Sequence, residues 1–412
     1  MKKRIVIIAE YFPPRLGGDR RIFELMKRLS RKYDIHFITL PPSYTLFIRK
    51  IESYRKEEND QVFCEGMTGH RLNLPKLLWK LWTRSFLFPF ALTLTYFSFQ
   101  ITKKIAELKP EIIIINNTSV YTGLLGFVAS RILSKKLLVE YNDLEALYAI
   151  GLVEKKLNPF LLAILGRMLV LIEDTIVRHG WKVTAITEFI KNYANTRGTR
   201  KDVKVIPDGV DTDFFDPAKN SGVQIRSKYG LSDKDNLCVY AGRIEESAGV
   251  NIILGTVQLL EKEDTVRFMI VGEGDQQLVN KLAGCSNVIL TGRVPKENIP
   301  EYLAAADIVL VPFPDSIASH SVSPLKLFEA LAMNKPIIAS AVSGIKEVVS
   351  ENFNGVLVSA RPKEWASAVL ELSKDNNINR EINNRKIVRS KYDWNYLAEE
   401  LDRIIDTDIS AV

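Results

Sequence analysis

The sequence predicts an α/β protein with two parallel sheets, each covered by helices on both faces. Short β-branched runs alternate with helical patterns along the chain, and these runs are continuously apolar. Continuous apolar runs are typical of strands that are buried on both faces, as in a parallel sheet. Because the runs fall into two series, we expect two Rossmann-like domains, with ligands beyond the carboxyl ends of the strands.

The expected strands of the first series are 5–9, 35–40, 111–115, 137–140, 183–186 and 203–206. The second series consists of 237–241, 267–271, 288–291, 308–311, 336–339 and 356–358. A polar segment with Pro207, Gly209 and Pro217 separates them, and proline and glycine favour such connections. We therefore predict domains 1–205 and 206–390, with a terminal helix in 391–412 that packs back on the first domain.

The composition is that of an ordinary soluble globular protein, with 412 residues, 25% charged and 46% apolar. The three cysteines and four histidines have no metal-ligand spacing, so a disulfide scaffold or a zinc site is not expected. The net charge of +7 suits a phosphate-rich ligand, nucleic acid or an anionic membrane, and does not choose among them. The basic start is followed by only five apolar residues, 5–9, too few for a signal peptide, so a cytoplasmic protein is expected.

A ligand-binding helix is predicted in the segment 321–332. Ser323 is a good N-cap and Pro324 suits the first helical position, so free N–H groups and the positive end of the helix dipole should lie there. Glu329, further along, could accept two hydrogen bonds from a diol such as ribose. Asn334 is expected as a left-handed C-cap. An ordinary capped core helix is the alternative.

Four glycine-containing turns follow expected strands: Gly17-Gly18, Gly242-Arg243, Gly272-Glu273-Gly274 and Gly292-Arg293-Val294. Glycine lets a backbone approach a ligand closely, and an arginine at such a turn could clamp a phosphate with two hydrogen bonds. As a dinucleotide signature the third turn is weak because its last glycine is missing. For Gly17-Gly18, a simple tight turn without a ligand is the alternative.

An Asp-x-Asp pattern, Asp211 and Asp213, lies in the connector between the domains. Paired carboxylates suit a divalent cation. Aspartate in a segment rich in proline and glycine, however, usually forms turns and caps. We therefore expect no metal site.

Taken in order, these motifs resemble glycosyltransferase family 4, which contains retaining nucleotide-sugar transferases with the GT-B fold. The matching segments are Gly17-Gly18, Ile206-Pro207-Asp208-Gly209-Val210-Asp211, Gly242-Arg243-Ile244 through Ala248-Gly249, Gly272-Glu273-Gly274, and Ser321 through Glu329. The resemblance covers nearly the whole chain and implies two domains facing across a crevice. The run from Ser323 to Glu329, together with residues 138–144, looks most like the branch that builds surface polysaccharides and lipid-linked oligosaccharides.

Two positions depart from the family pattern. Ala248 stands where the family usually has a lysine on its phosphate loop, and the charged hydrogen bond of such a lysine contributes about 1.5–3 kcal/mol. Lys326 could replace that charge, and the sequence does not tell whether Ala248 is natural or an introduced substitution. Ser321 replaces a glutamate that touches the donor sugar in the family, which leaves the sugar undetermined.

The resemblance implies that nucleoside diphosphate leaves while an acceptor hydroxyl attacks the same face of the sugar, without a protein nucleophile. We assign donor binding to Gly17, Gly18, Gly242, Arg243, Gly272, Gly274, Arg293, Val294, Ser321, Ser323, Pro324, Leu325, Lys326 and Glu329. The residues assigned to catalysis are Asn142, Asp143, Arg243 and Lys326. For Asp143, a cap of the next helix is the alternative. The donor is UDP- or GDP-linked, and no other cofactor is expected.

A basic amphipathic pattern in the first domain bears on the acceptor. Lys76, Lys80 and Arg84 recur every four residues beside an apolar surface that includes Trp82. This pattern is typical of a helix lying on an anionic membrane, which would suit a lipid-linked acceptor; a glycan acceptor is also considered. A helical pair packed on the first sheet is the alternative.

Two other classes of function are compatible with parts of this pattern. A nucleotide-sugar epimerase of the same fold would need no acceptor, and a non-catalytic nucleotide- or lipid-binding relative would not hydrolyse a donor. Nucleic-acid binding is not expected, because outside residues 76–88 the basic residues are spread along the chain and do not form a stripe interleaved with aromatic residues.

Overall fold

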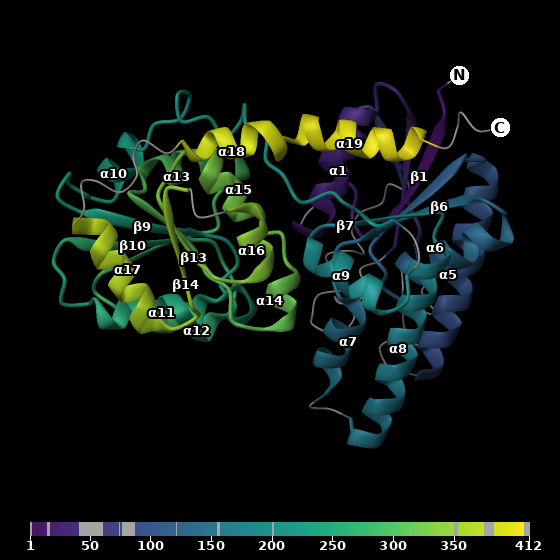
Figure 1. Ribbon diagram of the computed structural model, residues 1–412, viewed down its shortest axis with the longest axis horizontal. Coiled ribbons are helices and arrows are strands. Elements are labelled where there is room, and N and C mark those ends of the chain that lie inside the picture. Colours follow the sequence, from purple (N-terminus) through teal and green to yellow (C-terminus); the bar gives the residue numbers. More distant parts are fainter. Residues whose placement is uncertain are drawn as a thin grey trace. The chain divides into compact units, whose positions relative to one another are not determined.

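The computed structural model describes residues 2–14, 17–40, 61–73, 75, 87–120, 122–154, 157–199, 202–349, 353–374 and 383–407. The chain divides into two compact units (Figure 1). The first unit is Met1–Ile206 with Leu397–Val412, and the second is Pro207–Tyr396. Each unit has a mostly parallel sheet of its own, as the strand patterns predict.

The sheet of the first unit has the order β3-β4-β2-β1-β5-β6-β7-β8. Its strands are β1 (Arg4–Ala9), β2 (Asp34–Thr39), β3 (Gln61–Cys64), β4 (Met67–Arg71), β5 (Ile112–Asn116), β6 (Lys136–Tyr141), β7 (Lys182–Ala185) and β8 (Lys204–Val205). All neighbours are parallel except β3 and β4, a hairpin that is not among the expected strands. Glu65 and Gly66 turn this hairpin with positive φ angles of 51° and 77°, as a tight two-residue turn requires.

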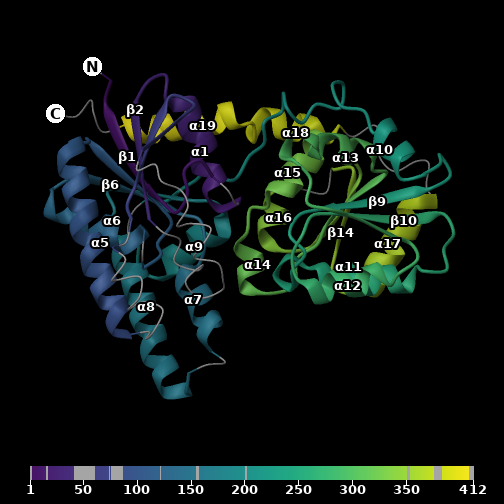
Figure 2. The ribbon, with the colours of Figure 1, turned by 180° about the vertical axis from the view of Figure 1, so that it is seen from behind.

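Helices cover both faces of this sheet (Figure 2). They are α1 (Gly17–Leu29), α5 (Leu87–Leu108), α6 (Thr122–Ile132), α7 (Glu145–Val153), α8 (Pro159–His179) and α9 (Glu188–Thr196). Helices α5, α6, α8 and α7 form one continuous layer, since α6 packs against both α5 and α8, and α7 packs against α8. The last helix, α19 (Trp394–Asp406), contributes Asp402, which accepts hydrogen bonds from Lys32 (2.7 Å) and Tyr33 (2.7 Å).

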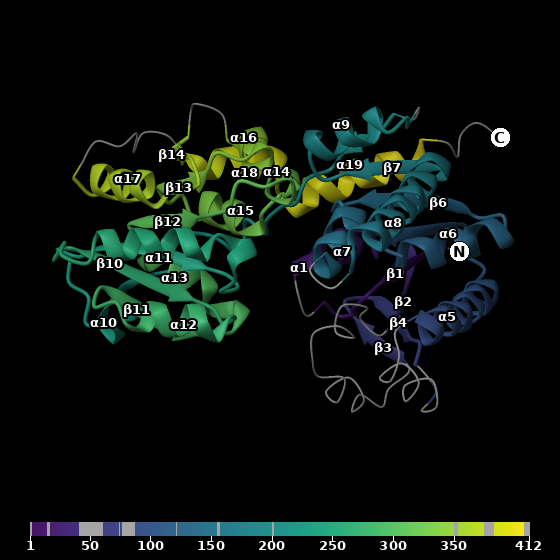
Figure 3. The same ribbon diagram turned by 90° about the horizontal axis from the view of Figure 1, so that it is seen from below.

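The second unit has a fully parallel sheet with the order β11-β10-β9-β12-β13-β14 (Figure 3). Its strands are β9 (Asn236–Ala241), β10 (Val266–Val271), β11 (Val288–Gly292), β12 (Ile308–Val311), β13 (Ile337–Ser340) and β14 (Gly355–Val358). Its helices are α10 (Val223–Lys228), α11 (Val250–Leu259), α12 (Gln276–Ala283), α13 (Ile299–Ala305), α14 (Ile317–Ser321), α15 (Leu325–Ala332), α16 (Ser343–Val348), α17 (Pro362–Lys374) and α18 (Asn384–Lys391), with the 3₁₀ turns Glu246–Ala248 and Lys296–Asn298. The strand order reverses between β9 and β12, and ligands of such folds bind where the order reverses.

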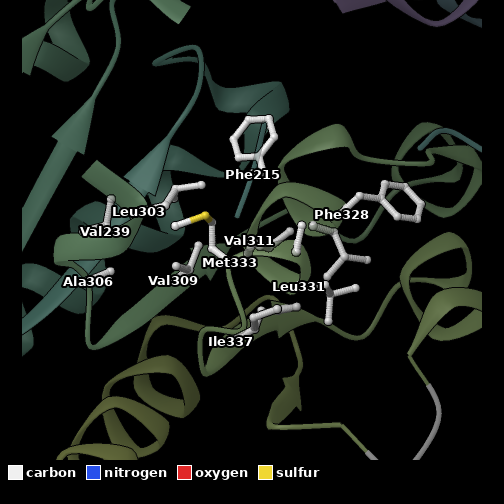
Figure 4. Packing of buried hydrophobic residues seen from close by; sticks show 14 of the residues in the cluster. Phe215, Val239, Leu303, Ala306, Val309, Val311, Phe328, Leu331, Met333 and Ile337 are labelled. Atoms are coloured by element: carbon white, nitrogen blue, oxygen red, sulfur yellow. The ribbon is translucent and has the colours of Figure 1, made fainter. Parts of the chain in front are cut away.

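Two apolar layers enclose the second sheet. In β12, Val309 and Val311 face one layer while Ile308 and Leu310 face the other, because successive side chains of a strand point to opposite faces. Figure 4 shows the first of these layers, which includes Phe328 of α15. The buried face of α15 therefore fixes this helix against the sheet and places its first turn beside the ends of β9 and β12.

Candidate functional site

Helix α15 begins later than the sequence suggests. Pro324 is the cap residue, with φ −82° and ψ 117°, and no side chain caps the helix. The Ser323 hydroxyl instead accepts a hydrogen bond from the backbone N–H of Asp208 (3.0 Å). The prediction of Ser323 as N-cap and Pro324 as first helical residue is therefore wrong, because a contact with a residue 115 positions away takes the hydroxyl.

The C-terminal end of α15 matches its prediction. Asn334 has a left-handed φ of 54°, and β13 follows from Ile337. At the other end, the N–H groups of Leu325 and Lys326 belong to the first turn and have no intrahelical acceptor. Both residues are predicted donor contacts, and their N–H groups lie at the positive end of the helix.

Lys326 lies in an aromatic box formed by two strand ends. Its ammonium nitrogen is 4.7 Å from the centre of the Tyr240 ring and 4.6 Å from that of the Phe313 ring. The Tyr240 hydroxyl, 3.5 Å from Nζ, donates to the carbonyl of Arg243 (2.6 Å). Burial lowers the pKa of Lys326 to about 7, and the nearby carboxylates of Glu329 and Glu245 only partly oppose this shift. Lys326 thus gains or loses its charge near neutral pH.

Arg243 and Glu329 flank this lysine. Arg243 forms an ion pair with Glu245, and its side chain is two-thirds exposed. Glu329 follows Lys326 by three residues, one helical turn, and is half-buried. The structure therefore brings Lys326, Arg243 and Glu329 into one region at the carboxyl ends of β9 and β12.

The predicted glycine turns pack closely against one another. The Gly242 N–H donates to the carbonyl of Val271 (2.9 Å), and the Gly272 N–H donates to the carbonyl of Gly292 (3.0 Å). A Cβ on Gly274 would lie 2.2 Å from the carbonyl oxygen of Ile244. Close packing of neighbouring turns thus explains these glycines without a ligand, and their contact with a donor stays a prediction.

The two residues predicted as donor contacts in the fourth turn lie in different surroundings. Arg293 is exposed and pairs with Glu273 at 3.2 Å. Val294 packs against the apolar core of the second unit. Its side chain therefore serves packing, and any donor contact of Val294 would involve its backbone.

Ala248 ends the 3₁₀ turn Glu246–Ala248 and packs partly against the core. Gly249 follows with a φ of 77°, and a Cβ there would lie 2.8 Å from the Phe313 N–H nitrogen. Glycine is needed at 249 both for this conformation and for the close approach to Phe313. The turn that ends at Gly249 therefore packs against Phe313, which follows β12 and is one of the two rings around Lys326.

Ser321 is buried, and its hydroxyl donates to the Ala318 carbonyl (2.8 Å). The preceding residue, His320, was not predicted as a site residue. Its Nδ1 accepts from the Ser343 N–H (3.1 Å), and its Nε2 is 2.9 Å from Asp315. These hydrogen bonds connect α14 to the start of α16. The one sequence signal for His320 as a site residue is its position next to Ser321.

In the first unit, Gly17 and Gly18 form the first turn of α1 rather than a loop before it. The next residue, Asp19, accepts hydrogen bonds from the Tyr11 N–H (2.8 Å) and from the Asn116 amide (2.7 Å). Burial raises the pKa of Asp19 to about 6. This carboxylate, which no sequence motif indicated, joins the end of β1 to the end of β5.

Asn142 and Asp143 lie at the end of β6, as predicted. The Asn142 amide donates to the side-chain oxygen of Asn116 (2.9 Å), extending the network from Asp19. The Asn117 amide donates to Asp143 (3.3 Å) and also to Glu145, whose pKa burial raises well above its usual range. Asp143 does not cap the next helix, which was the alternative role for this residue. Leu144 occupies the cap position of α7, and no side chain caps the helix.

Asp211 forms a turn, as expected for the connector. Its carboxylate accepts from the N–H groups of Asp213 (3.2 Å) and Phe214 (3.0 Å). Within the described ranges, no group of three or more histidine, cysteine, aspartate or glutamate residues could hold a metal ion.

The residues predicted to contact a membrane, Lys76, Lys80, Trp82 and Arg84, lie outside the described residues. Among the helices that the structure describes, none is both long and apolar enough to cross a bilayer.

Two family models match this chain. The model of glycosyltransferase family 4 matches residues 16–214, and that of the group 1 glycosyl transferases matches residues 235–375. A GDP-mannose-dependent α-(1-6)-phosphatidylinositol monomannoside mannosyltransferase from Mycobacterium tuberculosis is 25% identical over 243 residues. That match spans 55% of this chain and 63% of the relative.

Solved structures share the fold over the whole chain. Sucrose-phosphate synthase from Thermosynechococcus elongatus has a TM-score of 0.74 at 18% identity, covering 100% of both chains. HepE from Anabaena, solved in complex with UDP-glucose, has a TM-score of 0.70 at 16% identity, covering 98% of this chain and 99% of its own. Two parallel-sheet domains of this kind define the GT-B fold.

The order of the sequence motifs and the two family models agree with this fold. The chain belongs to glycosyltransferase family 4.

Proposed function

We propose that this protein is a retaining glycosyltransferase that moves a sugar from a nucleoside diphosphate sugar to an acceptor hydroxyl, in the synthesis of a glycolipid, a polysaccharide or a lipid-linked oligosaccharide. The observation that carries the proposal is the first turn of α15. It combines free N–H groups, the boxed ammonium of Lys326 and, one turn later, the carboxylate of Glu329. The N–H groups and the ammonium group favour binding of a phosphate, and the carboxylate favours binding of a ribose diol.

In this mechanism the chain stabilises charge on the leaving diphosphate rather than attacking the sugar. Arg243 and the charged form of Lys326 supply positive charge, and the N–H groups of α15 supply hydrogen-bond donors, where the charge of the leaving diphosphate develops. Lys326 is suited to this role because a diphosphate beside it would favour its charged form and raise its pKa above 7.

The first unit is assigned to the acceptor. Asn142 and Asp143 offer amide and carboxylate groups at the end of β6, and Glu145 shares the Asn117 amide with Asp143. Such groups can accept hydrogen bonds from sugar hydroxyls. The acceptor hydroxyl attacks the face of the sugar that the diphosphate leaves, so the anomeric configuration is retained.

The donor is a UDP- or GDP-linked sugar. Support comes from the Anabaena protein, solved with UDP-glucose, and from the mycobacterial relative, which is named for its dependence on GDP-mannose. Ser321 has a short side chain at the position that touches the donor sugar in the family, so sugar preference must come from other residues. Calorimetry with UDP and GDP in parallel would identify the base.

Glu329→Ala tests the proposal directly. Loss of charged hydrogen bonds to the ribose should weaken nucleotide binding by about 1.5–3 kcal/mol for each bond, which is tenfold or more. The measurement is isothermal calorimetry with the nucleoside diphosphate that the parent protein binds, and circular dichroism should show an unchanged fold.

Glu301→Ala is the matched control, because Glu301 is also a half-buried helical glutamate of the second unit but lies on α13. Its nucleotide affinity should equal that of the parent. Equal affinity in Glu329→Ala and Glu301→Ala would refute the assignment of Glu329 to the ribose.

A further inference from the structure

Helix α8 exposes a series of large apolar side chains. Phe160 is 74% exposed, Leu161 48%, Ile164 51%, Met168 51% and Leu171 63%. The later turns of the same helix are packed, since Ile176 and Val177 are buried. Only the first part of α8 is therefore uncovered, and Figure 1 shows this part, together with α7, extending beyond the other helices of its unit.

The most exposed of these side chains share one helical face. Phe160, Ile164, Met168 and Leu171 follow one another at spacings of four, four and three residues, which places them on one side of a helix with 3.6 residues per turn. Neighbouring α7 adds Tyr148, which is 56% exposed. We call the exposed side chains of residues 148, 160, 161, 164, 168 and 171 the α8 patch.

The exposed part of α8 carries one charged side chain, and it is positive. Residues 157–172 contain Arg167 and no other charged residue. Arg167 is exposed and lies seven residues after Phe160 and four before Leu171, on the apolar face itself. A guanidinium on an apolar face needs an anionic partner once that face is covered. Its aliphatic stem can lie along the apolar side chains while the head reaches that partner.

We propose that the α8 patch docks on an anionic lipid surface. Exposed apolar patches of this kind usually mark an interaction site. An apolar face that contains phenylalanine and leucine and carries an arginine fits the interface of a bilayer, where acyl chains surround the apolar side chains and a lipid phosphate pairs with the guanidinium. This inference goes beyond the proposed activity and does not depend on residues 76–84.

A second copy of this chain is a poorer occupant. In a symmetric dimer, the same patch would face itself. Arg167 would then meet the apolar face of another α8, whose residues 157–172 carry no carboxylate, and an unpaired charge buried in an interface is costly. Lipid phosphates supply the missing anion.

The test uses the full chain and vesicles of phosphatidylcholine with a minority of phosphatidylglycerol. The variant Phe160→Ser/Leu171→Ser removes the two most exposed apolar side chains of α8. Because partial burial of each contributes to binding in proportion to apolar area, cosedimentation with these vesicles should weaken about tenfold. Arg167→Gln should weaken binding to these vesicles and leave binding to pure phosphatidylcholine unchanged.

Val223→Ser/Leu259→Ser is the matched control. These side chains are 72% and 51% exposed and belong to the second unit, on α10 and α11. The control should sediment with vesicles as the parent does. Circular dichroism and the thermal shift produced by UDP or GDP should be the same in the parent and both double variants, so that a loss of vesicle binding is separated from a loss of folding or of nucleotide binding.

Three results would overturn the proposal. The first is equal sedimentation of Phe160→Ser/Leu171→Ser and the parent with the anionic vesicles. The second is an equal loss in the control variant, which would make the effect one of general surface hydrophobicity. The third is a concentration-dependent dimer, seen by analytical ultracentrifugation, that Phe160→Ser/Leu171→Ser abolishes and the control retains, because the occupant would then be a second copy.

Discussion

Arg21 in the first unit and Lys326 in the second are both largely buried cations, but their surroundings differ. Arg21 is 3% exposed and pairs with Glu140, itself fully buried, at 2.6 Å. It also donates to the carbonyl of Ile206 (2.8 Å). Lys326 lies between two aromatic rings, and among the described residues no carboxylate is within 4 Å of its ammonium group.

The difference separates a cation that serves the fold from one that can serve a ligand. A buried guanidinium with a buried carboxylate partner has its charge satisfied in the folded chain. A lysine among rings keeps an unneutralised charge, at the cost of a lowered pKa, and an incoming anion can satisfy it. Loss of Arg21 should therefore affect stability, whereas loss of Lys326 should affect binding.

The largest effect is expected from Arg21→Met. Removing one partner of a buried ion pair leaves Glu140 as an unpaired buried charge, and the free energy of unfolding should fall by about 3–5 kcal/mol. Urea unfolding of the variant and the parent measures this change. Arg4→Met is the control, because the Arg4–Asp34 pair has side chains 40% and 37% exposed and should contribute less than about 1 kcal/mol. Equal stabilities of the two variants would remove the contrast between buried and exposed pairs.

Lys326 should make donor binding depend on pH. With a pKa of about 7, Lys326 is mostly charged at pH 6 and mostly neutral at pH 8, so the affinity for UDP-glucose or GDP-mannose should fall about tenfold between these values. These sugars are suitable probes because their diphosphate does not titrate near neutral pH. Calorimetry at both pH values measures the effect.

Lys326→Met should bind these donors weakly and without this pH dependence, and the exposed Lys346→Met should behave as the parent. The folded-state pKa of Lys326 lies below the ordinary lysine value. Burial of this lysine therefore lowers the free energy of unfolding by its full amount below pH 7, and by a smaller amount as the pH rises toward the ordinary lysine pKa. Lys326→Met should therefore not destabilise the protein, in contrast to Arg21→Met. An unchanged pH profile in Lys326→Met would exclude Lys326 as the titrating group.

The smallest effect is expected from Ala248→Lys. The variant restores the lysine of the family pattern on a turn whose neighbours Glu246 and Ser247 are exposed, so solvent should screen the new charge. We expect nucleoside diphosphate to bind a few-fold to about tenfold more tightly, as measured by calorimetry. Ser247→Lys adds the same charge one residue earlier. An equal gain in both variants would indicate general attraction, and no gain in Ala248→Lys would indicate that Lys326 already holds the phosphate.

Local patterns in the sequence were sufficient for much of the fold. The apolar runs predicted the central strands of both sheets because a buried strand is recognisable from its own residues. The left-handed C-cap at Asn334 was predictable for the same reason, since a cap depends on neighbouring residues. The hairpin of β3 and β4 was missed because its strands, Gln61–Cys64 and Met67–Arg71, mix polar and apolar residues at the edge of the sheet.

Tertiary structure alone decided the chemical state of the site. Ser323 failed as an N-cap because Asp208, 115 residues earlier, supplies its hydrogen-bond donor. Arg21 meets Glu140 across 119 residues, and Lys326 meets Tyr240 across 86. The sequence predicted Lys326 as a cation near the phosphate, but its pKa near 7 results from burial between strand ends that only the folded sheet brings together. The α8 patch likewise became visible only in the structure, because an apolar helix has the same sequence pattern whether its face is covered or exposed.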